Sequence, residues 1–365
     1  MDYATKIIHA GADRDRITGA SSLPLYRAST FDQHDPDRLG GYDYSRSGNP
    51  TREALEKTLA ELEGAASALV FASGMAAVSS TLLLFQPGDQ LIVGADVYGG
   101  TFRALTRLFD RWGLLVAFVD AGNPDDIQAA ITPASRAILV ESPSNPLLRI
   151  TDLAAVAAIA GEHGLLAIAD NTFATPVLQR PLELGFDLVL HSATKFLNGH
   201  SDVLAGVAAA RTPELGARLK FVQNAFGAVL GPDDCWLLLR GLKTLGARLE
   251  AEQKTAHWLA ERLLELPGVT KVHYPALEGH PGREIHLRQA SGGGAVLSFE
   301  LRDAQLTGSF LQRLKLPLVA VSLGGVESIM SHPATMSHAA MPKPERERRG
   351  ITDRLVRLSV GLESG

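Results

Sequence analysis

The sequence has almost no cysteine and no long apolar run. Cys235 is the one cysteine among 365 residues, so no disulfide can form within the chain. No apolar stretch approaches the roughly 18 residues that a membrane-spanning helix needs. The opening residues, MDYATKIIHAG, lack the charged and apolar regions of a secretory signal. These absences predict a cytoplasmic protein without a membrane segment, in which Cys235 is a packing residue.

A strong excess of one charge is also lacking. The net charge is −5, and Lys and Arg are scattered rather than gathered into the basic patch that nucleic-acid binding needs. The composition, 45% hydrophobic and 21% charged, is typical of a globular chain and argues against disorder. We therefore expect small molecules as ligands and no nucleic-acid partner.

Short apolar runs alternate with helical patterns between residues 67 and 191. The runs are SALVFAS, QLIVG, LLVAFVD, RAILVES, LLAIAD and DLVLHS, and segments such as MAAVSSTLLLF and TDLAAVAAIAGEHG separate them. Strands that read as continuous apolar runs are typical of a parallel sheet covered by helices on both faces. The pattern predicts an α/β domain with a mostly parallel central sheet.

The flanking segments differ from this domain. Residues 1–48 have turn residues and little periodicity, so we predict an extended N-terminal arm there. A helix is expected to begin at Asn49-Pro50 and to end at Gly64. After about residue 231 the pattern changes to one long helix over 236–266, followed by the strand-like runs VTKVHY and AVLSFEL. We predict the α/β domain at 49–231 and a smaller α+β domain at 232–365.

Polar residues follow four of the apolar runs directly, at Ser73-Gly74, 141–146, Asp170-Asn171 and 192–195. Ligands of open α/β sheets bind at the carboxyl ends of the strands, so these four segments are expected to meet at one site.

Three of these segments suit the three parts of pyridoxal 5′-phosphate (PLP). A carboxylate that closes a buried strand, such as Asp170, needs a cationic partner, which a protonated ring nitrogen supplies. Lys195 lies among Ser, Ala, Thr and Phe, where its pKa is expected to fall, as an amine that binds an aldehyde requires. The start of a helix at Ser73 is suited to a phosphate. Taken alone, each residue also fits an ordinary role, as a loop cap, a surface lysine or a helix cap.

Eight ordered motifs carry a resemblance that covers nearly the whole chain. They are YDYSRSGNPTR (42–52), FASGMAA (71–77), DVYGGTFR (96–103), ESPSNPLL (141–148), ADNTF (169–173), HSATKFLNGHSDVLAG (191–206), SLGGVESIMSHPATMSHAAM (322–341) and RLSVGLE (357–363). Together they resemble the PLP-dependent enzymes of cysteine and methionine metabolism, the trans-sulfuration family. The resemblance implies the aspartate-aminotransferase-like fold, called fold type I.

The resemblance also implies the roles of the cofactor-binding residues. Lys195 would hold PLP as a Schiff base and move protons, Asp170 would pair with the ring nitrogen, and Tyr98 would stack on the ring and assist proton transfer. The phosphate would be bound by Ser73, Gly74, Met75, Ser192 and Thr194. Tyr44 and Arg46 would reach this phosphate from a neighbouring subunit. A homotetramer with active sites shared between subunits is therefore expected.

Substrate binding follows from the same resemblance. Arg357 would bind the α-carboxylate of an amino acid, helped by Asn145 and Ser322. In some relatives, a glutamate that matches Glu327 and an arginine near the position of Arg103 help to recognise the distal part of the substrate.

The implied reaction is carbon–sulfur bond cleavage. The stretch 224–363 most resembles bacterial cystathionine β-lyases, which predicts β-elimination from L-cystathionine to homocysteine, pyruvate and ammonia. The motifs YSRSGNPTR, ESPSNPLLR and SLGGVES also resemble cystathionine γ-lyases and γ-synthases, which are the alternative.

Other classes of site are disfavoured by spacing. His191, His200, His332 and His338 match no zinc pattern, so we expect no metal. The run SGGGAV lacks the strand–turn–helix setting of a dinucleotide site. A non-catalytic binding protein on the same scaffold is disfavoured because Tyr98, Asp170, Lys195 and Arg357 are all present.

Overall fold

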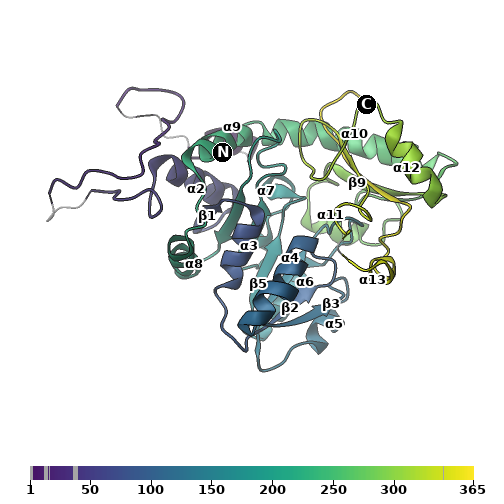
Figure 1. Cartoon of the computed structure of the whole chain (residues 1–365), viewed down its shortest axis with the longest axis horizontal. Helices are drawn as coiled ribbons and strands as arrows, with labels where there is room; N and C mark the ends of the chain where they lie inside the picture. Colours follow the sequence, from purple (N-terminus) through teal and green to yellow (C-terminus); the bar gives the residue numbers. More distant parts are fainter. Residues whose placement is uncertain (1–2, 12–14, 16, 36–39, 340) are drawn as a thin grey trace.

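The computed structural model describes residues 3–11, 15, 17–35, 40–339 and 341–365. Parts of the predicted N-terminal arm, residues 1–2, 12–14, 16 and 36–39, lie outside the described residues. Two sheets organise this described part of the chain, a larger one from residues 67–210 and a smaller one from residues 269–359 (Figure 1).

The larger sheet has seven strands within the described residues. In spatial order these are β1 (Ser67–Phe71), β7 (Gly206–Ala210), β6 (Leu188–Ser192), β5 (Leu166–Asp170), β4 (Ser135–Glu141), β2 (Gln90–Gly94) and β3 (Leu115–Val119). Neighbouring strands are parallel except at β7, which runs antiparallel to both β1 and β6. The predicted mostly parallel central sheet is therefore confirmed, and each of its six predicted strands is present.

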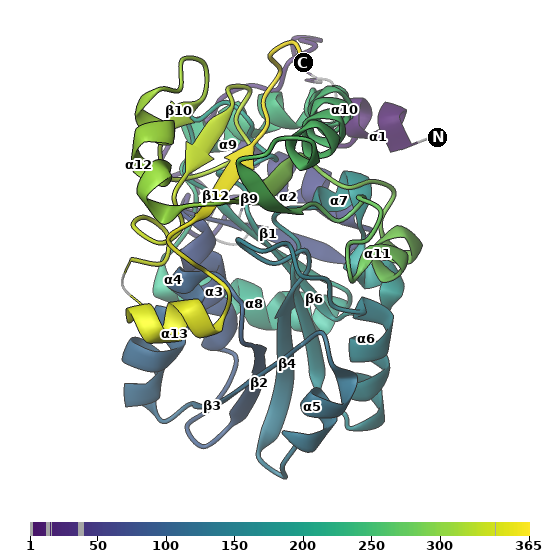
Figure 2. The ribbon, with the colours of Figure 1, turned by 90° about the vertical axis from the view of Figure 1, so that its right-hand side faces the viewer.

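Helices cover both faces of this sheet (Figure 2). One face packs against α3 (Gly74–Leu82), α8 (Pro213–Phe226) and the turns that follow α4 (Gly99–Arg103), while α5 (Pro124–Ala129) and α6 (Leu153–Glu162) cover part of the other. Within β2, Leu91 and Val93 face the first layer and Ile92 faces the second. This arrangement explains why the strands read as continuous apolar runs, since alternate side chains are buried on opposite faces.

Strand β7 was not predicted, because GVAAA contains a single β-branched residue. Its small side chains allow neighbouring segments to pack closely against the strand. A Cβ at Gly206 would lie 2.1 Å from the Ser73 carbonyl oxygen, so only glycine allows the turn before α3 to lie against this strand.

The helix α2 (Pro50–Glu63) begins and ends where the sequence predicts. The Asn49 side chain accepts hydrogen bonds from the backbone N–H groups of Thr51 and Arg52, and Pro50 occupies the first helical position. Gly64 ends the helix with a φ of 68°, in the left-handed region that favours glycine. Its apolar face packs against α9 (Pro232–Leu242) in the core beside β1.

The single long helix predicted over 236–266 is wrong. Two helices, α9 and α10 (Leu245–Leu264), form instead, separated by Lys243 and Thr244. The carbonyl oxygen of Gly241 accepts hydrogen bonds from the Thr244 hydroxyl at 3.1 Å and from the Arg248 guanidinium at 3.0 Å. The Thr244 backbone N–H also donates to this oxygen at 3.3 Å, in a tight turn that ends α9, so the helix is interrupted there.

The smaller sheet forms an α+β unit with α10 and α12 (Ala304–Gln312). Its strands, in spatial order, are β10 (Leu318–Val319), β11 (Ile329–Ser331), β12 (Leu355–Ser359), β9 (Val296–Leu301) and β8 (Val269–His273). Leu245 and Leu249 of α10 belong to the core of the larger unit, whereas Ala256 and Ala260 belong to that of the smaller one. The predicted domain boundary after residue 231 stays a proposal. The assignment of the two ends of α10 to different cores favours a boundary within this helix.

The remaining short elements connect these units. They are α1 (Tyr3–His9), a π-helical turn (Ala104–Leu108), two 3₁₀-helices (Phe109–Trp112 and Pro181–Leu184), α7 (Thr175–Leu178), α11 (Arg283–Gln289) and α13 (Lys343–Arg348). Ile7 of α1, which the sequence did not predict, is buried in the core that contains α2 and α9. None of the helices in the described residues is long and apolar enough to cross a membrane.

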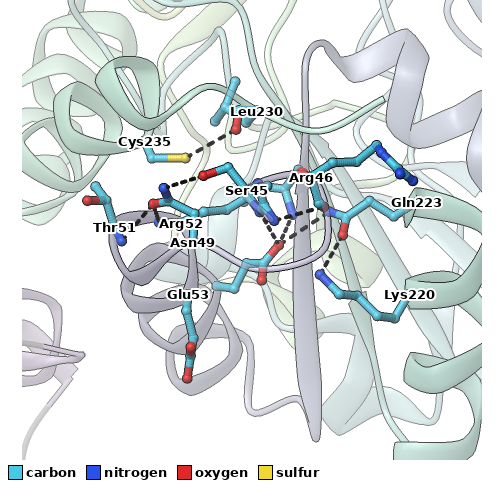
Figure 3. Close-up of polar contacts among 12 residues, drawn as sticks. Ser45, Arg46, Asn49, Thr51, Arg52, Glu53, Lys220, Gln223, Leu230 and Cys235 are labelled. Carbon is cyan, nitrogen blue, oxygen red and sulfur yellow. Dashed lines mark hydrogen bonds and ion pairs between the residues drawn. The ribbon is translucent and has the colours of Figure 1, made fainter. Parts of the chain in front are cut away.

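A buried ion-pair network joins the segment before α2 to the larger sheet (Figure 3). The Arg52 guanidinium donates to the carbonyl oxygens of Ser45 at 2.7 Å and Arg46 at 3.1 Å, and its Nε lies 3.8 Å from Glu56. Glu56 accepts from the Val70 N–H of β1 at 3.1 Å and from Gln223 of α8 at 3.3 Å. The network therefore fixes the backbone at Ser45 and Arg46.

We predict that Arg52→Leu lowers the free energy of unfolding by about 3–5 kcal/mol, because it leaves the largely buried Glu56 without its nearest guanidinium. Urea unfolding measures the change. Lys254→Ala is the control, since the Lys254–Glu250 pair is exposed and is expected to contribute about 0–1 kcal/mol. Equal unfolding midpoints for the two variants would contradict the prediction.

Candidate active site

Most of the predicted site residues line two adjoining cavities at the carboxyl edge of the larger sheet. The cavities have volumes of about 280 and 200 Å³ and share Tyr98, Asp170, Ser192 and Lys195. The first is also lined by Arg103, Asn145, Ser322 and Arg357, and the second by Ser73, Gly74, Met75 and Thr194. Residues as far apart in the sequence as Ser73 and Arg357 are thus brought together.

Three predicted residues do not line these cavities. Tyr44 and Arg46 lie on an exposed segment, where the Arg46 guanidinium donates to the Asn224 carbonyl oxygen at 2.7 Å and lies over the Tyr44 ring. Glu327 is exposed in the loop before β11.

Lys195 follows β6 and projects into both cavities. Its Nζ donates to the Ser322 hydroxyl at 2.6 Å. Burial, together with the nearby positive charge of Arg357, lowers the pKa of Lys195 from 10.5 to about 8. About a tenth of this amine is therefore uncharged at pH 7, far more than at the ordinary lysine pKa, and the predicted bond to an aldehyde requires this neutral form.

Asp170 closes β5 at the base of the cavities. Its Oδ1 accepts from the N–H of Thr172 at 3.1 Å and from the Thr172 hydroxyl at 2.5 Å, and that hydroxyl accepts from the N–H of Ser192 at 2.9 Å. Burial raises the pKa of Asp170, while the Thr172 hydrogen bonds and the nearby His191 oppose this shift. A protonated ring nitrogen would supply the positive charge that favours the ionised form.

The start of α3 is suited to a phosphate. Ser73 caps the helix by accepting from the Ala76 N–H at 3.0 Å. The N–H groups of Gly74 and Met75 belong to the first turn and therefore have no acceptor within the helix. A Cβ at Gly74 would lie 2.9 Å from the Ser192 Cβ, so glycine keeps the helix end close to this serine. The Thr194 hydroxyl lines the same cavity but already exchanges hydrogen bonds with the backbone of Ala205.

Arg357 is buried on β12 with neutral partners. One Nη donates to the Asn145 side-chain oxygen at 2.7 Å and the other to the Ser322 carbonyl oxygen at 2.6 Å. Its Nε is buried without a hydrogen-bond partner among the described residues, and no carboxylate there forms an ion pair with it. A buried guanidinium with an unused donor is suited to a carboxylate ligand.

Sequence reasoning noted Glu141 only as a polar residue after a strand and gave it no role. It lies at the end of β4 directly beside Asp170 and lines the first cavity. Thr172, which holds Asp170, was not singled out at all. The strand-end signal that identified Asp170 applies equally to Glu141 and was sufficient to find it.

Comparison with known proteins decides between cofactor classes. The model of the family described as Cys/Met metabolism PLP-dependent enzymes matches residues 4–365. This chain belongs to that family. Its members are PLP-dependent, so the cofactor of this Cys/Met metabolism enzyme is PLP, and the chemistry of the donors described above fits that group.

Individual relatives share most of this family member's length. It is 55% identical to the cystathionine beta-lyase MetC of Bacillus subtilis over 98% of this chain and 92% of the relative. It is 47% identical to a cystathionine gamma-lyase of the same organism, over 100% of this chain and 96% of that one.

A solved structure confirms the fold class. The cystathionine gamma-lyase of Lactobacillus plantarum complexed with L-serine has a TM-score of 0.97 and 46% identity, covering 100% of this chain and 95% of that one. The predicted fold type I architecture is therefore correct.

We predict that PLP added to the cofactor-free protein forms its linkage faster as the pH rises through about 8, because the neutral amine of Lys195 is the nucleophile. Arg357→Gln removes a positive charge near this amine, so the midpoint should move to higher pH. The growth of the visible absorbance band of bound PLP measures the rate. Arg354→Gln, which alters an arginine paired with Glu300, is the control and should keep the wild-type midpoint. An unchanged midpoint in Arg357→Gln would show that burial alone sets this pKa.

Proposed function

We propose that this enzyme is a carbon–sulfur lyase that converts L-cystathionine and water to homocysteine, pyruvate and ammonia. The observation that carries the proposal is the single site in which Lys195, Asp170 and the buried Arg357 meet. The 55% identity to a cystathionine beta-lyase supports the choice of substrate and bond.

The proposed roles follow from the geometry. Bound PLP supplies an electron sink for the bond-breaking steps at the substrate. Asp170 holds the ring nitrogen, and the N–H groups at the start of α3 with Ser192 hold the phosphate. Arg357 binds the α-carboxylate, with Asn145 and Ser322 fixing the guanidinium plane.

Proton transfer is assigned to Lys195. Its amine removes the α-proton, and the thiolate of homocysteine then leaves from the β-carbon. The Ser322 hydroxyl, 2.6 Å from Nζ, orients the amine within the cavity. Tyr98, with its ring at the boundary of both cavities, stacks on the cofactor and assists proton transfer. Arg103 lines the cavity and is available to the distal carboxylate, and Glu327 remains proposed for the same end of the substrate.

One assay separates this function from its alternative. We predict that the purified enzyme, supplied with PLP and L-cystathionine, releases pyruvate and homocysteine. Release of 2-oxobutyrate and cysteine would identify a γ-lyase, which the 47% identity to a cystathionine gamma-lyase makes the second candidate. Formation of cystathionine from an activated homoserine ester and cysteine would identify a γ-synthase. Lys195→Ala is the control and should yield none of these products.

We further propose a homotetramer whose active sites are shared between subunits. The exposed segment with Tyr44 and Arg46 does not line the cavities of its own chain, yet the Arg52 network holds its backbone firmly. A rigid exposed segment with an arginine and a tyrosine is suited to the phosphate of an adjacent subunit. A cytoplasmic location is proposed on the single cysteine.

We predict that co-expression of Lys195→Ala with Arg46→Ala restores activity that neither variant has alone. In a mixed pair, one site receives Lys195 from one chain and Arg46 from the other, so random pairing restores about a quarter of wild-type activity. Pyruvate release from L-cystathionine and light scattering measure activity and assembly. No restoration would show that Arg46 serves its own chain, and an active monomer would exclude shared sites.

A further inference from the structure

Glu141 is a buried carboxyl group in the site, and the proposed reaction assigns it no role. It ends β4, opposite Asp170 in the register with β5, and is 6% exposed. It lines the same cavity as Lys195 and Arg357. A carboxyl group in such a place is costly unless its oxygens have partners.

Each oxygen of Glu141 accepts one backbone N–H. Oε2 accepts from Tyr98 at 2.9 Å, and Oε1 accepts from Asn145 at 3.2 Å. The two donors lie on different loops, one leading into α4 and the other following β4. One side chain therefore ties both loops to the edge of the sheet.

Both loops carry side chains of the site. The Asn145 side-chain oxygen accepts from Arg357 at 2.7 Å, so a shift of the Asn145 backbone moves the partner of the guanidinium. The Tyr98 backbone is fixed beside Gly100, where a Cβ would lie 2.4 Å from the Tyr98 ring, so this ring has little room to move on that side.

We propose that Glu141 is a positioning residue. Through the backbone of Asn145 it holds Arg357 in the orientation that binds the substrate carboxylate. Through the backbone of Tyr98 it holds the Tyr98 ring beside the cofactor. This inference rests on the proposed function of Arg357 and Tyr98.

The hydrogen bonds of Glu141 guide the choice of variant. Burial, with the neighbouring Asp170 and Asp96 carboxyl groups, raises its pKa well above the usual value. Glu141→Gln keeps the size but replaces one acceptor oxygen by an NH₂ group, so one of the two N–H groups loses its acceptor.

Glycine is a suitable probe, because it has an α-carboxylate and no group that can leave. Its dissociation constant is read from the visible spectrum of the PLP-loaded enzyme. We expect Glu141→Gln to keep one PLP per subunit and its linkage to Lys195, while the dissociation constant for glycine rises about tenfold. The KM for L-cystathionine should rise by a similar factor, with a smaller change in kcat.

Coupling to Asn145 separates positioning from a general loss of stability. Asn145→Ala removes the Arg357 partner, so adding Glu141→Gln to it should weaken glycine binding less than Glu141→Gln does alone. Glu300→Gln is the control. Its carboxylate is mostly buried and paired with His273 and Arg354 on the smaller sheet, away from the cavity, so glycine binding should stay at the wild-type level.

The proposal is overturned if Glu141→Gln binds glycine as the wild type does, or if its effect and that of Asn145→Ala are additive. Glu141→Asp, which withdraws both oxygens, is the second variant if Glu141→Gln does not fold. Failure of both to fold would assign Glu141 to stability alone. Failure of the wild type to release pyruvate would reject the proposed reaction but leave the glycine test of Glu141 intact.

Discussion

The burial of Arg357 is the constraint on which the site depends. A guanidinium that is 3% exposed has lost nearly all its hydration, yet the described residues give it only an amide oxygen and a carbonyl oxygen as partners. Two neutral acceptors offset only part of the cost of burying the charge. In the role that we propose for Arg357, the carboxylate of a bound amino acid would supply the missing negative charge.

The same positive charge acts on the amine of Lys195. Burial and Arg357 together lower the pKa of Lys195, whereas burial raises the pKa of Asp170 and Glu141. These opposite shifts follow from one low-dielectric cavity, which disfavours the charged form of each group. Ser192 and the start of α3, the proposed phosphate site, line the same cavity as this amine.

Local signals in the sequence were sufficient for much of this architecture. The six predicted strands and the limits of α2 depend on apolar runs and caps that each lie within a few residues. The position of Lys195 and Asp170 after neighbouring strands was enough to place them together. By contrast, β7 depends on Gly206 packing against Ser73, which is distant in the sequence. The break between α9 and α10 depends on hydrogen bonds to Gly241 from Thr244 and Arg248, which hydrophobic periodicity does not reveal. The roles of Tyr98 and Arg357 came from resemblance to the family.

The contact between Lys195 and Ser322, which are distant in the sequence, has the weakest signal in the sequence. Lys195 and Ser322 are separated by 127 positions, and Ser322 adopts a φ of +88°, which side-chain-bearing residues rarely adopt. Its backbone is held by the hydrogen bond from Arg357 to its carbonyl oxygen. Ser322, which accepts the hydrogen bond of the Lys195 amine, is thus held by Arg357, the residue proposed to bind the carboxylate. Since β- and γ-elimination differ in which carbon the amine must reach, the proposed roles of Arg357 and Lys195 would make the reaction outcome depend on this shared support.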